Sequence, residues 1–195
     1  MKLAPLLLAA SAAWAHSAAA EGLAVYGYGT YRGAANIEST TTGSNSITGL
    51  KPAPSLDILL AIPYSQDTAL EFYASSSQHE FEPGAQGKLR AYHLQFGGVK
   101  YVEPNPDKGS MYVGFMLGGS QLETPGTRDY QPSFSLYGGY EWRPARNLGL
   151  RLEARWIGVL FDAETDVVCS GGCRARIQSG VWSQGSLGVG VGLRF

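Results

Sequence analysis

Apolar and polar residues alternate with a period of two along most of this chain, the pattern of strands that present one apolar face. The last stretch, Val181 to Phe195, shows it most clearly. From Leu187 onward every second residue is apolar, and the residues between them are small or polar. This apolar face continues to the final aromatic residue, which is unusual for a strand at the end of a soluble domain.

Segments of this kind recur along the chain and predict eight strands of roughly ten residues each. They are expected at Leu23–Ala34, Ser55–Ile62, Thr68–Ser77, Leu89–Tyr101, Met111–Ser120, Ser133–Trp142, Leu148–Phe161 and Val181–Phe195. The connections between them alternate between long polar loops and short turns rich in turn-forming residues. The polar stretch 36–46 and the stretch Gln121–Gln131 are both assigned to long loops. This alternation predicts an all-β, eight-stranded antiparallel up-and-down barrel with the short turns and both chain ends on one side.

The two faces of the predicted strands differ in chemistry. The second segment places Leu56, Ile58 and Leu60 opposite Asp57. Which residues of the first segment point inward stays open, because its tyrosines alternate with glycines. Which face of the fifth segment points inward also stays open, although an outward apolar face is the better fit. That face comprises Met111, Val113, Phe115 and Leu117.

An eight-stranded barrel can be soluble, with its apolar face inward, or transmembrane, with its apolar face toward lipid. A continuous inner row of Arg151, Glu153 and Arg155 in the seventh segment would be a poor lining for the apolar cup of a soluble barrel. We therefore predict the transmembrane form. Tryptophans near strand ends are candidates for its aromatic girdles; they are Trp142, Trp156 and Trp182.

Composition agrees with one all-β domain. The 195 residues include 26 glycines and 11 tyrosines, and only 16% are charged. The formal charge of −1 gives no basic footprint for nucleic acid.

The first residues predict a secretory signal peptide over 1–20. Lys2 precedes a short apolar run, and the small residues Ala18 to Ala20 favour cleavage after Ala20, with cleavage after Ala15 as the alternative. The mature domain would span 21–195. Its longest apolar run, Ile58 to Ile62, is far shorter than the roughly 20 residues that a membrane-spanning helix needs.

With these features the mature chain resembles the small opacity- or OmpA-like outer-membrane β-barrel proteins of Gram-negative bacteria. The most specific resemblance lies in the last third, in the runs L-G-L-R-L-E-A-R, C-S-G-G-C and G-V-W-S-Q and in the terminal G-L-R-F. The resemblance implies an outer-membrane location, contact with membrane lipid and lipopolysaccharide, and recognition of Phe195 by the barrel-assembly machinery. It extends to the barrel alone, without the peptidoglycan-binding domain of full-length OmpA.

The polar faces supply a set of charged residues for the barrel interior: Asp57, Glu71, His93, Glu141, Arg151, Glu153, Arg155 and Arg194. Four carboxylates and three arginines nearly cancel, and an eight-stranded barrel is only wide enough for its own side chains. A plugged interior held by paired charges is therefore favoured over a narrow pore.

Cys169 and Cys173 lie in the last long loop, and in an exported protein they predict a disulfide. No metal site, cofactor or catalytic residue is predicted. His79 beside three serines is the one arrangement that suggests nucleophilic catalysis, as in a lipid A-modifying enzyme, but no nucleophile-elbow motif accompanies it. The sequence thus favours a monomeric structural or surface-interaction protein with four external loops, ahead of a narrow channel and of an enzyme.

Overall fold

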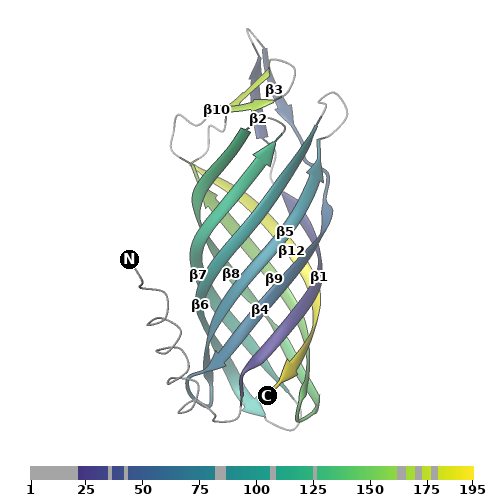
Figure 1. Cartoon of the computed structure of the whole chain (residues 1–195), viewed down its shortest axis with the longest axis vertical. Helices are drawn as coiled ribbons and strands as arrows, with labels where there is room; N and C mark the ends of the chain where they lie inside the picture. Colours follow the sequence, from purple (N-terminus) through teal and green to yellow (C-terminus); the bar gives the residue numbers. More distant parts are fainter. Residues whose placement is uncertain are drawn as a thin grey trace, which may run out of the picture.

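The barrel predicted from the alternation is confirmed. The computed structural model describes residues 22–34, 37–41, 44–81, 87–105, 109–124, 127–161, 166–169, 173–176 and 180–195. Eight antiparallel strands close in the order β1-β12-β9-β8-β7-β6-β5-β4 (Figure 1). They are β1 (Ala24–Ala34), β4 (Ala53–Pro63), β5 (Thr68–Glu80), β6 (Lys88–Asn105), β7 (Gly109–Thr124), β8 (Thr127–Ala145), β9 (Leu148–Leu160) and β12 (Val181–Arg194).

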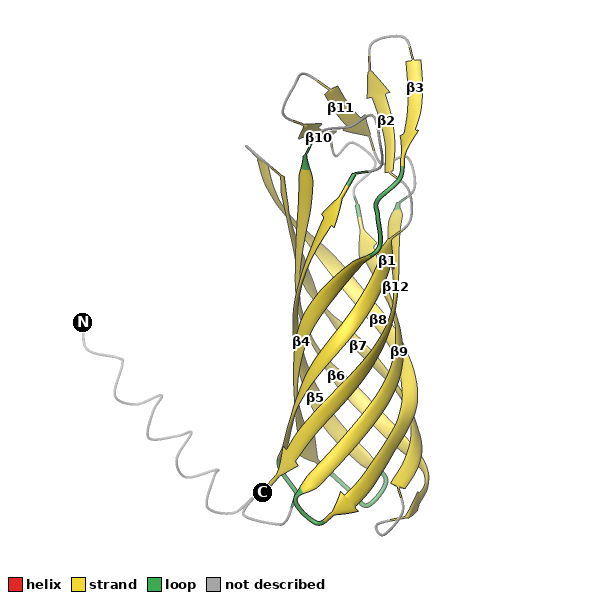
Figure 2. Ribbon diagram, turned by 90° about the vertical axis from the view of Figure 1, so that its right-hand side faces the viewer, coloured by secondary structure: helices red, strands yellow, loops and turns green. Residues whose placement is uncertain are grey.

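The barrel closes where the described chain begins and ends. The amide of Gly22 donates to the carbonyl oxygen of Phe195 at 2.9 Å, and β1 pairs with both β4 and β12. The C-terminus and the short turns lie at the same end of the barrel (Figure 2). In the part of the chain that the structure covers, no helix is long and apolar enough to cross a membrane.

The sequence analysis predicted that the polar stretch 36–46 is a loop, and this prediction is wrong for most of the stretch. The stretch contributes β2 (Ile37–Thr41) and β3 (Ser44–Thr48), which join β10 (Asp166–Cys169) and β11 (Cys173–Arg176) in a four-stranded sheet at the loop end (Figure 2). Threonine and isoleucine recur in β2 and β3, and these β-branched residues favour pleated structure even without an apolar face.

The prediction of a long loop between the fifth and sixth segments is also wrong. Strands β7 and β8 continue pairing from Gln121 opposite Tyr130 up to Thr124 opposite Thr127. Backbone hydrogen bonds, unlike an apolar face, do not require lipid, so a hairpin continues beyond the apolar part of its strands.

The apolar face of the strands points outward. Leu56, Leu94 and Leu187 are 77%, 70% and 67% exposed. In β7, whose facing the sequence left open, the apolar residues Met111 and Val113 are exposed and therefore point outward. The interior is lined instead mainly by polar, charged and tyrosine side chains, with a few apolar ones such as Leu59, Met116 and Ile157. This is the reverse of a soluble barrel and the arrangement that a lipid environment requires.

The direction of β1 follows from its neighbour β12. Tyr26 and Tyr28 point inward and lie opposite Gly192 and Gly190. A Cβ at Gly192 would lie 2.3 Å from the Tyr26 ring, so the glycine makes room for the aromatic side chain. In the same way Gly114 lies opposite Tyr137, and its Cβ would lie 2.2 Å from that ring.

The prediction that Trp182 belongs to an outer aromatic girdle is wrong. Trp182 alternates with outward Val181 and is only 2% exposed, so it fills the barrel near the loop end. Trp142 and Trp156 do lie on the outer face.

Candidate functional site: the charged barrel interior

A central arginine organises the half of the interior near the short turns. Arg151 on β9 is 1% exposed, and its guanidinium lies 2.8 Å from Glu71 Oε1 and 2.9 Å from Glu141 Oε2. The same group lies 4.2 Å from the ring centre of Tyr26 and 4.8 Å from that of Tyr112. Two carboxylates and two aromatic faces thus compensate one buried cation.

Glu141 on β8 connects this centre to the barrel rim. Its Oε1 accepts from Arg143 Nε at 2.6 Å and from Arg194 Nη1 at 3.4 Å. The side chains of Arg143 and Arg194 are 15% and 21% exposed, whereas that of Glu141 is buried. One carboxylate therefore faces three arginines, and positive charge exceeds negative charge at this rim.

The middle of the interior holds a second ion pair. Arg155 Nε donates to Glu153 Oε1 at 2.8 Å, and its guanidinium lies between the rings of Tyr73 and Tyr137 at 3.9 Å and 4.1 Å. The hydroxyl of Tyr112 donates to the other carboxylate oxygen of Glu153 at 3.0 Å. Aromatic faces and a hydroxyl from three strands, β5, β7 and β8, therefore fix this pair in one geometry.

A third pair lies closer to the loops and includes a residue that the sequence analysis missed. Arg32 on β1 is fully buried and lies 3.4 Å from Asp57 Oδ1. It also donates to Tyr73 at 2.8 Å and to Ser75 at 2.9 Å. Arg32 was missed because Tyr and Gly left the direction of its strand open. The inward glycines of the last strand were the signal that could have identified it.

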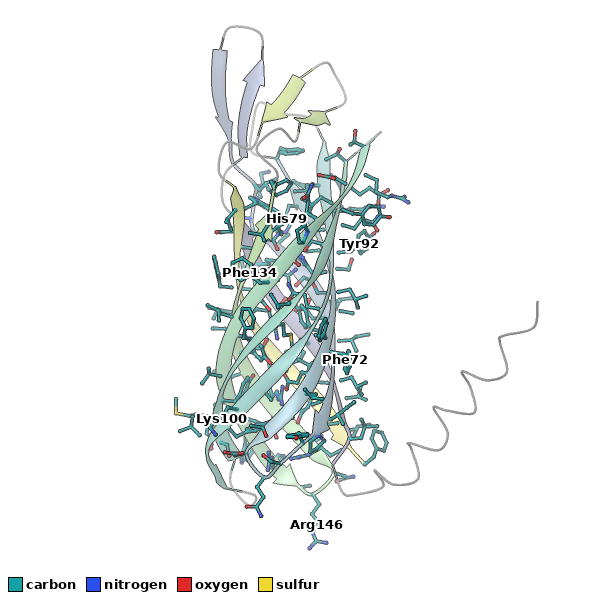
Figure 3. All side chains as sticks on the ribbon, turned by 90° about the vertical axis from the view of Figure 1, so that its left-hand side faces the viewer. Phe72, His79, Tyr92, Lys100, Phe134 and Arg146 are labelled. Carbon is teal, nitrogen blue, oxygen red and sulfur yellow. The ribbon has the colours of Figure 1, made fainter. Side chains whose placement is uncertain are left out.

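Two histidines occupy the interior near the loop end, where Figure 3 labels His79. His93 Nδ1 lies 2.6 Å from Ser120 Oγ, and its Nε2 lies 3.1 Å from Gln184 Oε1. His79 Nδ1 lies 3.1 Å from the carbonyl oxygen of Lys51, which can only accept, so Nε2 is left to accept from the Ser77 hydroxyl at 3.2 Å. Both rings are therefore held by polar partners in the wall.

The structure places all eight residues of the predicted interior set inside the barrel or at its rim. Seven are buried: Asp57, Glu71, His93, Glu141, Arg151, Glu153 and Arg155. Arg194 lies at the rim, and the set gains Arg32, Arg143 and a group of inward tyrosines. Among the described residues, no three His, Cys, Asp or Glu side chains are grouped as metal ligands.

The predicted disulfide lies in the small loop sheet. Cys169 and Cys173 are directly opposite each other in the antiparallel pair of β10 and β11. Their side chains lie outside the described part of the structure, so the bond stays a prediction. The predicted signal peptide, 1–20, also lies outside the described residues.

Comparison with known proteins identifies the fold. No protein-family model and no curated protein sequence matches this chain. Solved structures do match: the outer membrane protein OprG from Pseudomonas aeruginosa has a TM-score of 0.66 at 8% identity, covering 90% of this chain and 96% of OprG. Neisserial surface protein A has a TM-score of 0.56 at 12% identity and covers 89% of this chain and 97% of its own.

The outer membrane protein AlkL, solved in lipid bilayers, matches with a TM-score of 0.55 at 13% identity, covering 89% of this chain and 90% of AlkL. The chain therefore has the fold of the small OmpA-like outer-membrane barrels. At these identities the likeness shows the fold and not the activity.

Proposed function

We propose that this protein spans the Gram-negative outer membrane as a barrel with a closed interior and displays its external loops for a structural or surface-interaction role. Its outward apolar face and inward charges support the membrane location, as does the fold that it shares with outer-membrane proteins. We further propose that the chain is a monomer and that the assembly machinery recognises Phe195, an exposed aromatic residue next to the last strand.

The observation that carries this proposal is the succession of ion pairs along the interior. From the turn end to the loop end it includes Glu141–Arg151–Glu71, then Glu153–Arg155 and then Arg32–Asp57. Removing one partner of a buried pair typically costs about 3–5 kcal/mol. An ion that crossed the barrel would have to separate several of these pairs, so the geometry favours a scaffold over a channel.

Single-channel recording tests this proposal. The mature protein is refolded, its folding is verified by circular dichroism, and it is inserted into a planar bilayer. We expect no discrete conductance. Reproducible steps that change size in Arg151→Ala or Arg155→Ala would show that the charged interior conducts, and the channel alternative would replace the scaffold.

The enzyme alternative has one supporting observation, the contact between His79 Nε2 and Ser77 Oγ at 3.2 Å. Both side chains are at least 96% buried, and a backbone carbonyl rather than a carboxylate orients the ring. A nucleophile needs access to its substrate, so this geometry favours a structural role. A mass shift in lipid A that depends on the protein and disappears in His79→Ala would establish the enzyme instead.

A further inference from the structure

Four polar side chains form a closed ring inside the loop-facing half of the barrel. Arg32 Nη1 donates to Ser75 Oγ at 2.9 Å, and Ser75 on β5 lies directly opposite His93 on β6. His93 Nε2 lies 3.1 Å from Gln184 Oε1. Gln184 extends from β12, which lies across the barrel from β6 and next to the strand that carries Arg32. The ring therefore spans the interior between β1 and β12 on one side and β5 and β6 on the other.

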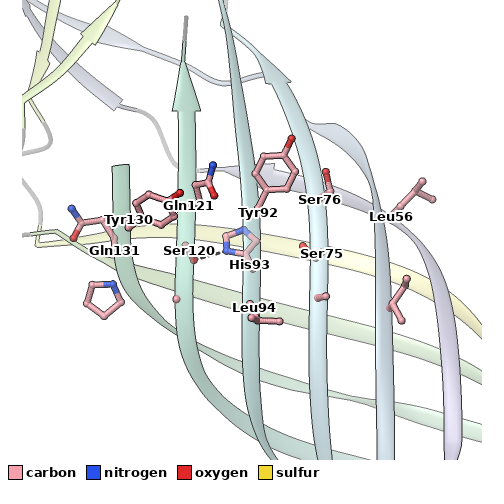
Figure 4. Close-up of a pocket in the computed structure, with 14 residues that line it drawn as sticks. Leu56, Ser75, Ser76, Tyr92, His93, Leu94, Ser120, Gln121, Tyr130 and Gln131 are labelled. Atoms are coloured by element: carbon pink, nitrogen blue, oxygen red, sulfur yellow. Dashed lines mark hydrogen bonds between the residues drawn. The ribbon is translucent and has the colours of Figure 1, made fainter. Parts of the chain in front are cut away.

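The side of this ring formed by β5 and β6 is held by the barrel wall. Figure 4 shows Ser75, His93 and Ser120 on three neighbouring strands, with the hydrogen bond between His93 and Ser120. The outer surface of the same wall is hollowed by a groove of about 910 Å³, whose lining includes Leu94 and Gly119. Both ring nitrogens of His93 have polar partners, so this side of the ring needs no ligand.

Two donors on the other side of the ring lack partners. Arg32 and Gln184 are 0% and 1% exposed, and within the described ranges neither Arg32 Nε nor Gln184 Nε2 has a hydrogen-bond partner. Arg32 lies opposite Ser186, two residues from Gln184, and this diagonal relation separates Cβ atoms by roughly 7 Å. Long side chains at that separation can reach the same atom. Buried side-chain donors nearly always have an acceptor, so the pair predicts one acceptor between them.

Arg32 is also the buried arginine with the loosest ion pair. Arg151 and Arg155 each lie 2.8 Å from a carboxylate oxygen, the distance of a strong charge-assisted hydrogen bond. Arg32 lies 3.4 Å from Asp57, and its shorter contacts, at 2.8 Å and 2.9 Å, are to neutral hydroxyls. Asp57 in turn accepts from two neutral hydroxyls at 3.0 Å and 3.1 Å. The positive charge of Arg32 is therefore compensated less closely than that of the other two.

The side chains next to the two donors are short. Ser186 on β12 and Ala53 on β4 lie directly opposite Arg32. Nearer the turns, the inward positions of β1 carry Tyr26 and Tyr28 instead. The width of a barrel is set by its strands, so short side chains leave more of the cross-section to a ligand. All of these residues are at most 8% exposed, so a ligand between the donors would be shielded from solvent.

We propose that Arg32 Nε and Gln184 Nε2 bind a small monovalent anion of halide size inside the barrel. An anion accepts from both donors and brings to Arg32 the negative charge that Asp57 supplies only at 3.4 Å. A water molecule would accept from the same donors but would add no charge beside the guanidinium. The site goes beyond the scaffold role proposed above, because it gives the closed interior a ligand of its own.

Bromide tests the site directly, because it is a halide that scatters X-rays anomalously. The mature protein is refolded in detergent with sodium bromide, so that the ion can enter before the barrel closes, and is crystallised in the same salt. Anomalous difference density is then recorded at the bromine absorption edge. We expect a peak in contact with both Arg32 Nε and Gln184 Nε2.

Urea unfolding in lipid vesicles measures the affinity. A ligand that binds only the folded barrel lowers the unfolding equilibrium constant by a factor of one plus the ratio of its concentration to its Kd. Sodium gluconate serves as the reference salt, because its anion has the same charge and is too large for the site. We expect the unfolding equilibrium constant to be about tenfold lower in bromide than in gluconate, which corresponds to a Kd near one tenth of the bromide concentration.

Two glutamine variants separate the site from general effects of salt. Gln184→Glu places a carboxylate beside Arg32 and should abolish the difference between bromide and gluconate, because the chain then supplies the negative charge. Gln95 is the matched control: it is also buried, but its amide donates to Ser133 at 3.0 Å and accepts from Ser135 at 2.8 Å. Gln95→Glu should keep the tenfold difference. Arg32→Met, which removes the cation, is the second test if Gln184→Glu does not fold.

Three results would overturn the proposal. A bromide effect of equal size in the wild type, Gln184→Glu and Gln95→Glu would show a general effect of salt on the barrel. Protein refolded in bromide without an anomalous peak at Arg32 would leave water as the acceptor. A peak without any bromide effect on unfolding would show an adventitious ion only. None of these measurements reads conductance or loop ligands, so their failure is distinct from failure of the closed-interior scaffold.

Discussion

Removing Arg151 offers the sharpest test of the closed interior, because the structure shows which charge it would leave alone. In Arg151→Met, Glu141 keeps Arg143 at 2.6 Å and Arg194 at 3.4 Å. Among the described residues, Glu71 keeps the Tyr137 hydroxyl as its one hydrogen-bond partner, at 2.6 Å, and loses its cation. One buried carboxylate without a counter-ion corresponds to a loss of about 3–5 kcal/mol in the free energy of unfolding.

The size of the effect should depend on Glu71. Glu71→Gln alone leaves Arg151 paired with Glu141 at 2.9 Å and should cost about 1.5–3 kcal/mol, the value of one hydrogen bond to a charged group. The double variant removes the orphaned charge together with its partner. We expect it to be at least about 2 kcal/mol more stable than the sum of the single losses predicts.

Reversible urea unfolding of the protein in lipid vesicles, followed by tryptophan fluorescence and circular dichroism, measures all four corners of this cycle. The single variants serve as controls for each other, since both alter the same interior cluster. A loss below about 1 kcal/mol in Arg151→Met, or strict additivity in the double variant, would contradict the argument. Either result would mean that water reaches Glu71, and a hydrated interior would favour the channel.

Three further predictions follow from local geometry. Gly114→Ala should destabilise the barrel by about 1–3 kcal/mol because its Cβ would overlap an inward tyrosine ring, whereas Gly27→Ala meets nothing within 4 Å and should change unfolding by less than about 0.5 kcal/mol. Intact-mass measurement with thiol alkylation should find Cys169 and Cys173 oxidised, and reducing this small ring should cost at most about 2 kcal/mol. A hydrogen bond from Lys100 lowers the pKa of Asp67 below its usual 3.8. The contribution of Asp67 to the free energy of unfolding is therefore present above pH 3.8 and is lost as the pH falls through the lower pKa of the folded state. Asp67→Asn should accordingly make unfolding less dependent on pH in this acid range.

The sequence by itself determined the class of fold. Period-two alternation gives each strand one apolar face, and this local property does not depend on which strands are neighbours. The row of Arg151, Glu153 and Arg155 in the seventh segment then favoured a polar interior and an apolar outer face, because a row of charges is a poor lining for an apolar cup. The predicted interior residues Asp57, Glu71, Glu141 and Glu153 are all buried in the structure.

Only the tertiary structure decided the features that depend on register. Tyr26 alternates with Gly27, and nothing in the local sequence decides which of the two points inward. The inward glycines Gly190 and Gly192 of β12 decide it, because they leave room for the tyrosine rings. That choice brought Arg32 into the interior. The continuation of β7 and β8 and the small sheet from the loops likewise depend on backbone pairing rather than on apolar periodicity.

The outer groove has the same origin. Ala74, Leu94 and Gly119 are unremarkable in the sequence, and each satisfies the rule that outward residues are apolar or small. Cross-strand register places them side by side in one row on the outer face of the barrel. Alternation fixes which way a side chain points, but its neighbours come from distant parts of the chain, and so a site like the one between Arg32 and Gln184 forms only when the barrel closes.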